Sequence, residues 1–184
     1  MIVIFRGVSG SWKSSSVMIL EGKANSFWDT GENLQKDNEW AQYMFRLRQE
    51  TKKLPHRGTF SADKHFIDEN GDYRFNPKQL GEAHRLCMLG YLTAVRESNI
   101  ETPELIIVDN TNCSIAEVAP YLQTGLAYGH QVKVVTLLRE PRECAKDNEH
   151  EVPTRSIVNQ ANALDDSIRN WPPWWPQDIL FTGR

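Results

Sequence analysis

Cysteine pairs, long apolar runs and a strong excess of either charge are all missing from this sequence. The three cysteines, Cys87, Cys113 and Cys144, show no CxxC spacing and cannot all pair, so we expect reduced structural thiols in a reducing compartment. Nothing in their spacing suggests a zinc site. No apolar run approaches the roughly eighteen residues of a membrane span, and the apolar start, Met1–Phe5, is too short for a signal peptide. These absences predict a soluble, cytoplasmic protein with no membrane partner.

Charge is present in ordinary amounts but is unevenly distributed. The formal net charge of −3 argues against wholesale coating of nucleic acid and leaves a local basic groove open. Lys and Arg outnumber Asp and Glu only over residues 1–57, so we expect any phosphate-rich partner to approach this third of the chain. Nothing in the sequence indicates an oligomeric state.

Apolar and polar segments alternate in a way that predicts strands and helices in turn, and hence a parallel sheet with helices on both faces. Strands are predicted over Ile2–Arg6, Gly58–Ala62, Leu105–Val108, Gln131–Leu138 and Asp178–Thr182. Helices are predicted over Lys13–Gly22, Trp40–Lys53, Pro77–Asn99, Ser114–Tyr128, Glu143–Glu149 and Thr154–Asn170, with a turn over Asp68–Asp72. The 184 residues suit a single α/β domain, with an insertion at about 23–57.

The link between the first strand and the first helix reads Gly-Val-Ser-Gly-Ser-Trp-Lys-Ser from Gly7 to Ser14, the order of a P-loop. Small residues let successive backbone N–H groups curl around a phosphate, and the helix N-terminus adds partial positive charge. Lys13 would neutralise phosphate charge, and the Ser14 hydroxyl would bind Mg²⁺. The residues predicted to bind ATP are Gly7, Val8, Ser9, Gly10, Ser11, Trp12, Lys13, Ser14 and Ser15. We predict a P-loop NTPase three-layer sandwich; the alternative is a glycine-rich turn without a ligand.

Trp12 departs from the P-loop pattern, because it stands where the motif has its second glycine. An indole lacks the conformational freedom of glycine. Two outcomes follow from the sequence: the indole narrows the nucleotide site, or it stacks on a neighbouring group. The sequence does not distinguish a natural tryptophan from an engineered one.

Four segments together extend the pattern: Gly7–Ser15, Phe60–Phe66, Tyr73–His84 and Ile107–Asn112. They resemble the small P-loop kinases related to phage polynucleotide 5′-hydroxyl kinase, including similar domains described as AAA-type ATPases. The likeness covers the first twenty residues and about 58–160. It implies transfer of a phosphoryl group from ATP, with Mg²⁺, to a hydroxyl. The resemblance makes the 5′-OH of a polynucleotide or nucleotide the first candidate acceptor. It also implies a phage-encoded protein located in the host cytoplasm.

Two carboxylates take roles through this resemblance. Asp63 matches the general base that accepts the proton of the acceptor hydroxyl, and a position after a strand end beside the P-loop suits that role. The alternative is an Asp that caps the next segment. Asp109 ends an apolar strand where P-loop enzymes place the acid that holds Mg²⁺ or its water. The alternative is an Asx turn with Asn110 and Asn112.

The segment Glu143–Pro153 looks like the lid of the same family, in which arginines brace the transferring phosphoryl group. Members usually read Arg-Arg-Asn-x-His-Gly-Val here, whereas the run from Lys146 to Val152 reads Lys-Asp-Asn-Glu-His-Glu-Val. The added carboxylates, Asp147 and Glu151, would oppose stabilisation of a phosphoryl oxygen. Arg139, Arg142 and Lys146 would compensate if they reach the phosphoryl group, and Arg142 and Lys146 are the predicted catalytic residues.

Three other features keep two interpretations each. His84 belongs to the resembling segment, yet a packed, hydrogen-bonded histidine explains it as well. Trp174 and Trp175 either stack on a base or cap a core edge. The third feature is a basic set that either grips a nucleic-acid backbone or covers a solvated helix face: Arg46, Arg48, Lys52, Lys53, His56 and Arg57.

Three functions follow from these patterns. The first is an ATP-dependent kinase acting on a polynucleotide or nucleotide 5′-OH. The second is a degenerate P-loop protein that binds nucleotide or a partner without turnover, as Trp12, Asp147 and Glu151 would favour. The third is a kinase for a small molecule, since related folds serve many substrates.

Overall fold

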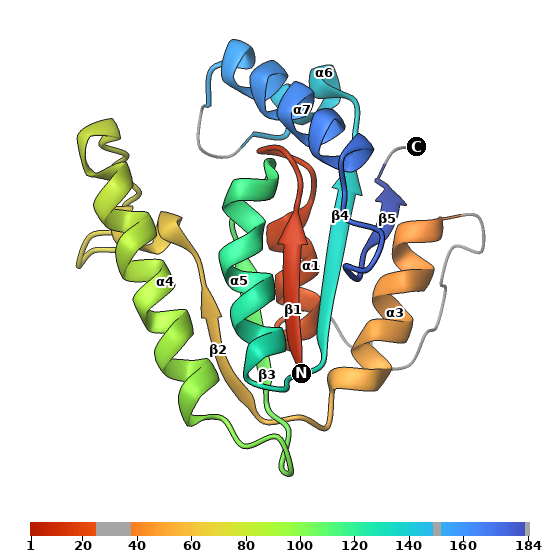
Figure 1. The fold of residues 1–184 in the computed structure, drawn as a ribbon. Coiled ribbons are helices and arrows are strands. Elements are labelled where there is room, and N and C mark those ends of the chain that lie inside the picture. Colours follow the sequence, from red (N-terminus) through yellow and green to blue (C-terminus); the bar gives the residue numbers. More distant parts are fainter. Residues whose placement is uncertain (25–37, 149–151, 183–184) are drawn as a thin grey trace.

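The computed structural model describes residues 1–24, 38–148 and 152–182, and its centre is a five-stranded parallel sheet in the order β2-β3-β1-β4-β5 (Figure 1). The strands are β1 (Ile2–Arg6), β2 (His56–Phe60), β3 (Leu105–Asp109), β4 (Val132–Leu138) and β5 (Asp178–Phe181). The helices are α1 (Lys13–Leu20), α3 (Glu39–Thr51), α4 (Leu80–Glu97), α5 (Ile115–Ala127), α6 (Pro141–Lys146) and α7 (Thr154–Arg169). Two 3₁₀ helices, η1 (Ala62–Phe66) and η2 (Pro77–Gln79), precede α4.

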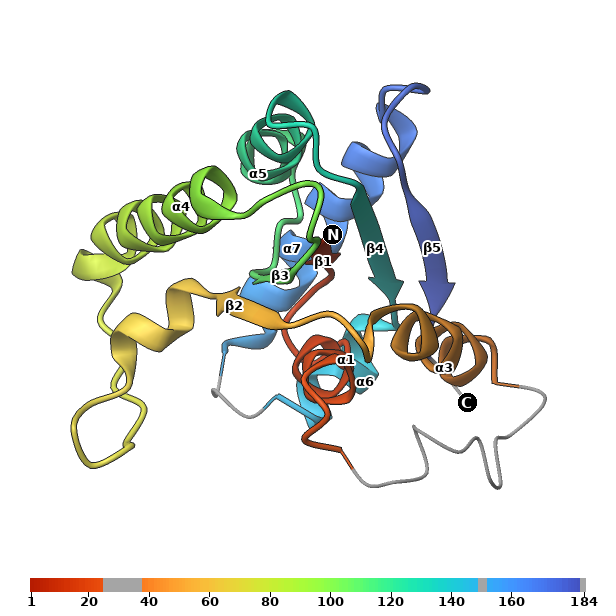
Figure 2. The same ribbon diagram turned by 90° about the horizontal axis from the view of Figure 1, so that it is seen from below.

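Helices cover both faces of the sheet, with α4 and α5 on one side and α1 and α3 on the other (Figure 2). Alternate residues of the central strand serve the two faces, because successive side chains of a strand point in opposite directions. Ile2 and Ile4 join the core beneath α4 and α5, whereas Val3 and Phe5 join the core beneath α1 and α3. The predicted three-layer α/β arrangement is therefore confirmed.

A third apolar cluster lies at the carboxyl edge of the sheet, where α6 and α7 pack together (Figure 1). It includes Val8 of the loop after β1 and the buried thiols of Cys113 and Cys144. The loop after β1 is thus held by helices that come more than a hundred residues later. Among the described residues, no helix is both long and apolar enough to span a bilayer.

Several predicted boundaries needed correction. The second strand runs from His56 to Phe60 and not from Gly58 to Ala62, so Asp63 lies in η1 and not directly at a strand end. The long helix predicted from Pro77 begins as η2, with Asn76 accepting a hydrogen bond from the Lys78 N–H at 3.0 Å. The helix predicted over Glu143–Glu149 begins earlier, at Pro141, and ends at Lys146. Glu149 lies outside the described residues.

Helix α3 packs into the core although its residues fall in the predicted insertion at 23–57. Trp40, Met44 and Leu47 are buried against α1 and the sheet, which accounts for their i, i+4, i+7 spacing. Residues 25–37 of the insertion lie outside the described residues. Whether the segment is an insertion stays a prediction, but its helix is part of one layer.

Candidate active site

The loop after β1 curls over the start of α1 at the carboxyl edge of the sheet, beside a cavity of about 100 Å³. Gly10 has a φ of +83°, and a Cβ there would lie 2.2 Å from the Cys144 carbonyl oxygen, so only glycine fits. Ser9, Gly10, Ser14 and Ser15 line the cavity. The geometry is that of a phosphate-binding loop opening onto a helix N-terminus.

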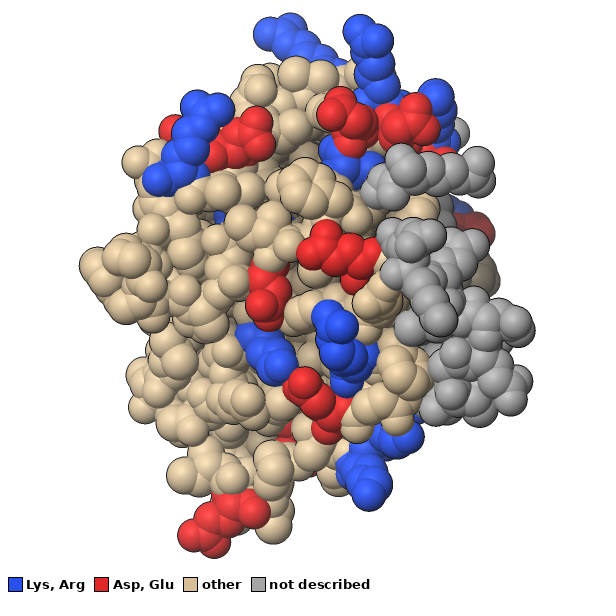
Figure 3. All heavy atoms as spheres, turned by 90° about the vertical axis from the view of Figure 1, so that its right-hand side faces the viewer, with Lys and Arg blue, Asp and Glu red and all other residues tan. Residues whose placement is uncertain are grey.

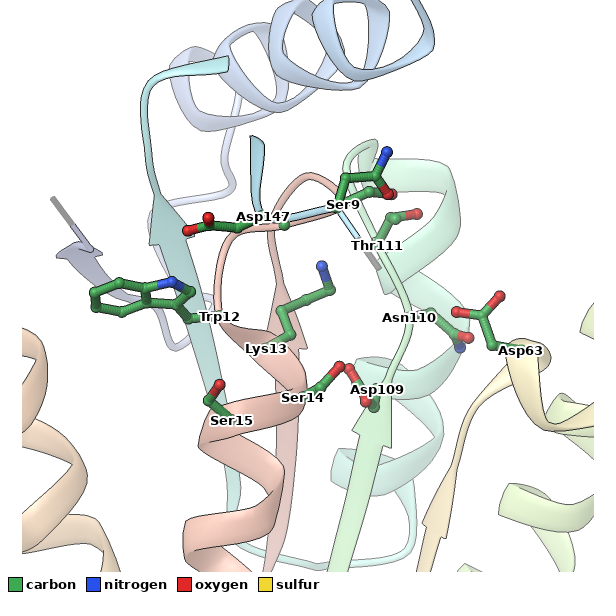
Figure 4. Close-up of a pocket in the computed structure, with 12 residues that line it drawn as sticks. Ser9, Trp12, Lys13, Ser14, Ser15, Asp63, Asp109, Asn110, Thr111 and Asp147 are labelled. Atoms are coloured by element: carbon green, nitrogen blue, oxygen red, sulfur yellow. The ribbon is translucent and has the colours of Figure 1, made fainter. Parts of the chain in front are cut away.

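Lys13 lies across the mouth of this loop and projects into the cavity (Figure 4). Its Nζ donates to the carbonyl oxygens of Gly7 at 2.9 Å and Val8 at 2.8 Å. Burial lowers the pKa of Lys13, and the charge of Asp109 opposes that effect. Lys13 is thus a buried ammonium whose hydrogen bonds go to two loop carbonyls and whose charge is opposed by that of Asp109.

Trp12 is one of the residues that line the cavity, and its ring stacks on two neighbouring side chains. Its backbone keeps the left-handed conformation that glycine would adopt there, with φ +72°, which is costly for a bulky residue. The indole packs edge-to-face on Trp40 with ring centroids 5.1 Å apart, and the Arg139 guanidinium lies 4.9 Å from its centroid. In Figure 4 the ring points away from Lys13. The predicted stacking is therefore present, and narrowing of the nucleotide site stays a prediction, since Trp12 also lines the cavity.

Arg139, directly after β4, is a second cation that contacts the loop. It donates to the Gly10 carbonyl oxygen at 2.8 Å and pairs with Asp147 at 2.6 Å. Its guanidinium lowers the pKa of Asp147. Asp147 itself lines the cavity, as does Asn148. The charge of the Asp147 carboxylate is thus balanced by Arg139.

Arg142 and Lys146 are not brought to this place. Both side chains are exposed, and Lys146 pairs with Glu143 on the outside of α6 at 2.7 Å. Neither Arg142 nor Lys146 is among the described residues that line the cavity. Their catalytic role stays a prediction that this arrangement does not favour. His150 and Glu151 of the lid lie outside the described residues.

Ser14 and Asp109 offer the oxygen ligands of a magnesium site. Both line the cavity, Ser14 from the first turn of α1 and Asp109 from the end of β3 (Figure 4). Burial raises the pKa of Asp109, whereas the charge of Lys13 lowers it. Hard oxygen ligands of this kind fit Mg²⁺, which keeps several waters and shares phosphate oxygens with its substrate. The donor set therefore suits the metal that the sequence predicts.

Asp63 faces Lys13 across the cavity from η1 (Figure 4). The Tyr73 hydroxyl donates to its Oδ1 at 3.1 Å, and burial together with this carboxylate raises the pKa of Tyr73. The Asn110 Oδ1 accepts a hydrogen bond from the Ala62 N–H at 2.8 Å and so ties η1 to the end of β3. The Asp63 carboxylate is held by its neighbours at the open side of the cavity.

Asn110 and Asn112, the partners of Asp109 in the alternative Asx turn, form side-chain hydrogen bonds to distant segments. The Asn110 Nδ2 donates to the Tyr121 hydroxyl at 3.3 Å, and the Asn112 Nδ2 donates to the Phe5 carbonyl at 2.9 Å. Both side chains are buried. They anchor the loop after β3 to α5 and β1.

Two residues that no sequence pattern singled out also hold the site. The Gln160 Oε1 of α7 accepts from the Ser9 N–H of the loop at 2.9 Å. Arg6, the last residue of β1, is fully buried and donates to the carbonyls of Asn112 at 2.9 Å and Cys113 at 3.2 Å. Burial lowers the pKa of Arg6 to about 10. The sequence signal that could have identified Arg6 was a charged residue at the end of an otherwise apolar strand.

The remaining predicted features separate clearly. His84 is exposed and lines a second hollow, so the interpretation of His84 as a packed core histidine is wrong. Trp175 packs on the core and on Trp171, as a core-edge residue does, whereas Trp174 is 79% exposed.

The predicted basic set does not adjoin the phosphate loop. Its last members surround the start of β2, at the amino edge of the parallel sheet, and the loop lies at the carboxyl edge. Arg57 pairs with Glu97 at 2.7 Å and with Glu104 at 3.5 Å, and Arg48 donates to the Leu20 carbonyl. On the face that carries α3 and β5, Lys and Arg are interspersed with Asp and Glu (Figure 3). This arrangement favours the solvated helix face.

Comparisons with known proteins agree with this architecture. No protein-family model matches the sequence. Human NEDD4-binding protein 2 is 30% identical over 166 residues, which are 86% of this chain and 7% of that protein. The chain thus spans a small part of its curated relative.

Solved kinases share the fold. The APS kinase CysC of Mycobacterium tuberculosis, in complex with AMPPNP and APS, is 17% identical, with 100% of this chain and 88% of that one covered and a TM-score of 0.51. A gluconokinase from Sinorhizobium meliloti 1021 is 13% identical, with 99% and 82% covered and a TM-score of 0.52. The likeness to phage polynucleotide kinase stays a prediction. With its phosphate loop, parallel sheet and these structural neighbours, the chain has the P-loop NTPase α/β fold.

Proposed function

We propose that this protein is an ATP-dependent phosphotransferase that acts on a hydroxyl group. One observation carries the proposal: a single cavity brings together the phosphate loop with Lys13, the Ser14 and Asp109 oxygens, and the Asp63 carboxylate on the opposite side. A phosphoryl transfer needs these three functions within reach of one another, because catalysis is mostly positioning and charge stabilisation. The kinase fold of the structural neighbours supports the same reading.

In this proposal each group of the chain has one task. Lys13 and the loop N–H groups bind and orient the phosphates of ATP. Ser14 and Asp109 would hold Mg²⁺, which neutralises charge on phosphate oxygens when bound. Asp63 accepts the proton of the attacking hydroxyl, and Tyr73 orients that carboxylate. Arg139 takes the place proposed from the sequence for Arg142 and Lys146, since it contacts the loop directly.

The acceptor we propose first is the 5′-OH of a polynucleotide or nucleotide, and a small molecule is the alternative. A nucleotide-binding protein without turnover is a second candidate, and one observation favours it. Arg139 is already neutralised by Asp147 at the cavity, so the cation that would stabilise the transferring group is occupied.

A transfer assay tests the proposal. The protein is incubated with γ-labelled ATP, Mg²⁺ and, separately, a 5′-OH oligonucleotide, nucleosides and simple sugars. We expect labelled oligonucleotide or nucleoside with the natural chain and none with Lys13→Ala. Labelled sugar alone would establish the small-molecule alternative. ATP binding by calorimetry without any transfer would establish the degenerate form, and absence of ATP binding would end the proposal.

A further inference from the structure

A second hollow, of about 240 Å³, opens between α4 and α5 next to the phosphate cavity. In Figure 1 the two helices diverge toward the carboxyl edge of the sheet. Thr111, in the loop after β3, lines both hollows, so they meet at this residue. The other lining residues are His84 and Met88 on α4, Asn112 in the loop after β3, and Glu117, Pro120 and Tyr121 on α5.

The walls of this hollow are apolar. Met88 and Pro120 supply aliphatic surface, and Tyr121 supplies a ring. The Tyr121 hydroxyl is bound within the core: it receives a hydrogen bond from Asn110 at 3.3 Å and donates to the Cys87 Sγ at 3.4 Å. The hydroxyl end of the ring is therefore held in place, and a flat ligand would meet a preorganised surface.

The hollow carries no fixed positive charge among its described lining residues, and its polar members are His84, Thr111, Asn112 and Glu117. None of the described residues that line the hollow is Lys or Arg. Glu117 receives a hydrogen bond from the Ser114 N–H on Oε2 at 2.8 Å, as part of the capping box of α5, which leaves its Oε1 as an acceptor at the rim. His84 is exposed on α4 across from it. A carboxylate among described lining residues that include no Lys or Arg disfavours phosphate and other anions and favours a neutral group with N–H donors.

We propose that this hollow binds the nucleobase of the acceptor. Apolar walls with a few polar groups at one edge are the usual composition of a small-ligand site, and a base combines a flat apolar face with N–H and carbonyl groups along its edge. With the base between Met88 and Tyr121, the attached sugar lies toward Thr111 and the phosphate cavity, where Asp63 accepts the hydroxyl proton. The inference rests on the proposed function and narrows its acceptor to a nucleoside end.

The test measures binding of uncharged probes in the absence of ATP. Adenosine, guanosine, cytidine and uridine are titrated by calorimetry or ligand-observed NMR, with ribose as the probe that lacks a base. We expect nucleosides to bind and ribose not to bind. Met88→Trp, which fills the hollow, should weaken nucleoside binding at least tenfold. The matched control is Leu89→Trp, at the neighbouring position, which is 46% exposed and is not among the lining residues.

Two milder variants keep the test decisive where Met88→Trp fails to fold. Glu117→Gln preserves the cap of α5, because glutamine serves in a capping box as well as glutamate, and should weaken binding several-fold for bases with exocyclic amines. His84→Ala changes an exposed side chain and should weaken binding similarly. Equal binding of ribose and nucleosides, equal effects of Met88→Trp and Leu89→Trp, or no nucleoside binding at all would overturn the proposal.

Failure of the proposed function has a different signature. Lys13→Ala should lose ATP and keep nucleoside binding, because Lys13 does not line the second hollow. A chain that binds nucleosides and never ATP would refute the phosphotransferase and retain the hollow as a base site. A chain that transfers phosphate to hydroxyls irrespective of a base would retain the phosphotransferase and refute the hollow.

Discussion

The two walls of the phosphate cavity hold their charged groups in opposite ways. On the side of β2 and β3, Asp63 is an exposed carboxylate that receives one hydrogen bond from Tyr73, and its segment is tied down through Asn110. On the side of β4, Arg139 is enclosed: it stacks on Trp12, donates to Gly10 and pairs with Asp147. The first wall presents a group free to accept a proton. The second presents a cation that already has a counterion.

The difference separates binding from chemistry. Removing the free carboxylate should affect only the step in which the hydroxyl attacks, whereas changes on the enclosed side should affect phosphate binding and the stability of the loop. Four variants test this division, from the largest expected effect to the smallest.

Asp63→Asn should lower kcat by roughly 10²–10⁴-fold, the usual contribution of a general base, because the amide keeps the shape and loses the proton acceptor. The fall should appear equally in kcat/KM, and ATP affinity by calorimetry should stay the same. Tyr73→Phe is the matched control: it removes only the hydroxyl that orients Asp63, so its effect should be much smaller. Full activity of Asp63→Asn would move the role of base to Asp109.

Arg139→Met should weaken ATP binding about tenfold, since a charge-assisted hydrogen bond to phosphate contributes about 1.5–3 kcal/mol and part of this is already offset by the contact with Asp147. Arg142→Met, three residues away and exposed, should leave the dissociation constant nearly unchanged. The reverse order of the two effects would restore the lid arginine predicted from the sequence and would contradict the cavity as described here.

Trp12→Gly should lower stability by about 1 kcal/mol, seen as a fall in Tm of roughly 2–4 °C. Glycine relieves a left-handed backbone that costs about 1–2 kcal/mol. The variant also loses the ring contact with Trp40, about 0.5–1.5 kcal/mol, the contact with Arg139, about 0.5–1 kcal/mol, and the burial of the indole. Trp12→Phe keeps an aromatic ring, so its Tm should lie between that of the natural chain and that of Trp12→Gly. A higher Tm for Trp12→Gly would mean that backbone strain outweighs the stacking.

Asp147→Asn should strengthen ATP binding by about threefold, because it releases Arg139 from an exposed ion pair of modest strength. Glu143→Gln, which breaks the pair with Lys146 on the outer side of α6, should change nothing. Since Arg139 lowers the pKa of Asp147, the pair is complete above the ordinary Asp pKa of about 3.9 and is lost as the pH falls through the still lower folded value. The difference from the natural chain should therefore persist across neutral pH.

Local pattern was enough to predict most of the frame. The β-branched run before Gly7, the Lys-Ser pair at a helix start and the amphipathic spacing of Trp40, Met44 and Leu47 each depend on neighbours within a few residues. The predicted position of β2 was two residues too late, because the segment from His56 to Ala62 has no clear alternation of apolar and polar residues. The strand also pairs with β3 through a register shift between His56 and Gly58.

The placement of the site's side chains depended on contacts between segments far apart in the chain. The Trp12 ring points outward because it packs on Trp40 and Arg139 there. Arg139 in turn donates a hydrogen bond to Gly10, 129 residues earlier in the chain. Arg142 and Arg139 look alike in the sequence, yet only the end of β4 beside β1 aims one of them at the loop. His84 lies at a hollow because α4 and α5 diverge.

The sequence by itself determined the strand–loop–helix that can bind phosphate and the alternation that builds a parallel sheet around it. Only the tertiary structure decided which cation and which carboxylates face that loop, and that a second hollow adjoins it. The physical reason is the separation along the chain over which the determining interactions act. Backbone conformation and amphipathic period are encoded over one or two helical turns, whereas the charge, burial and pairing of an active-site group are set by whichever distant segments the fold brings against it.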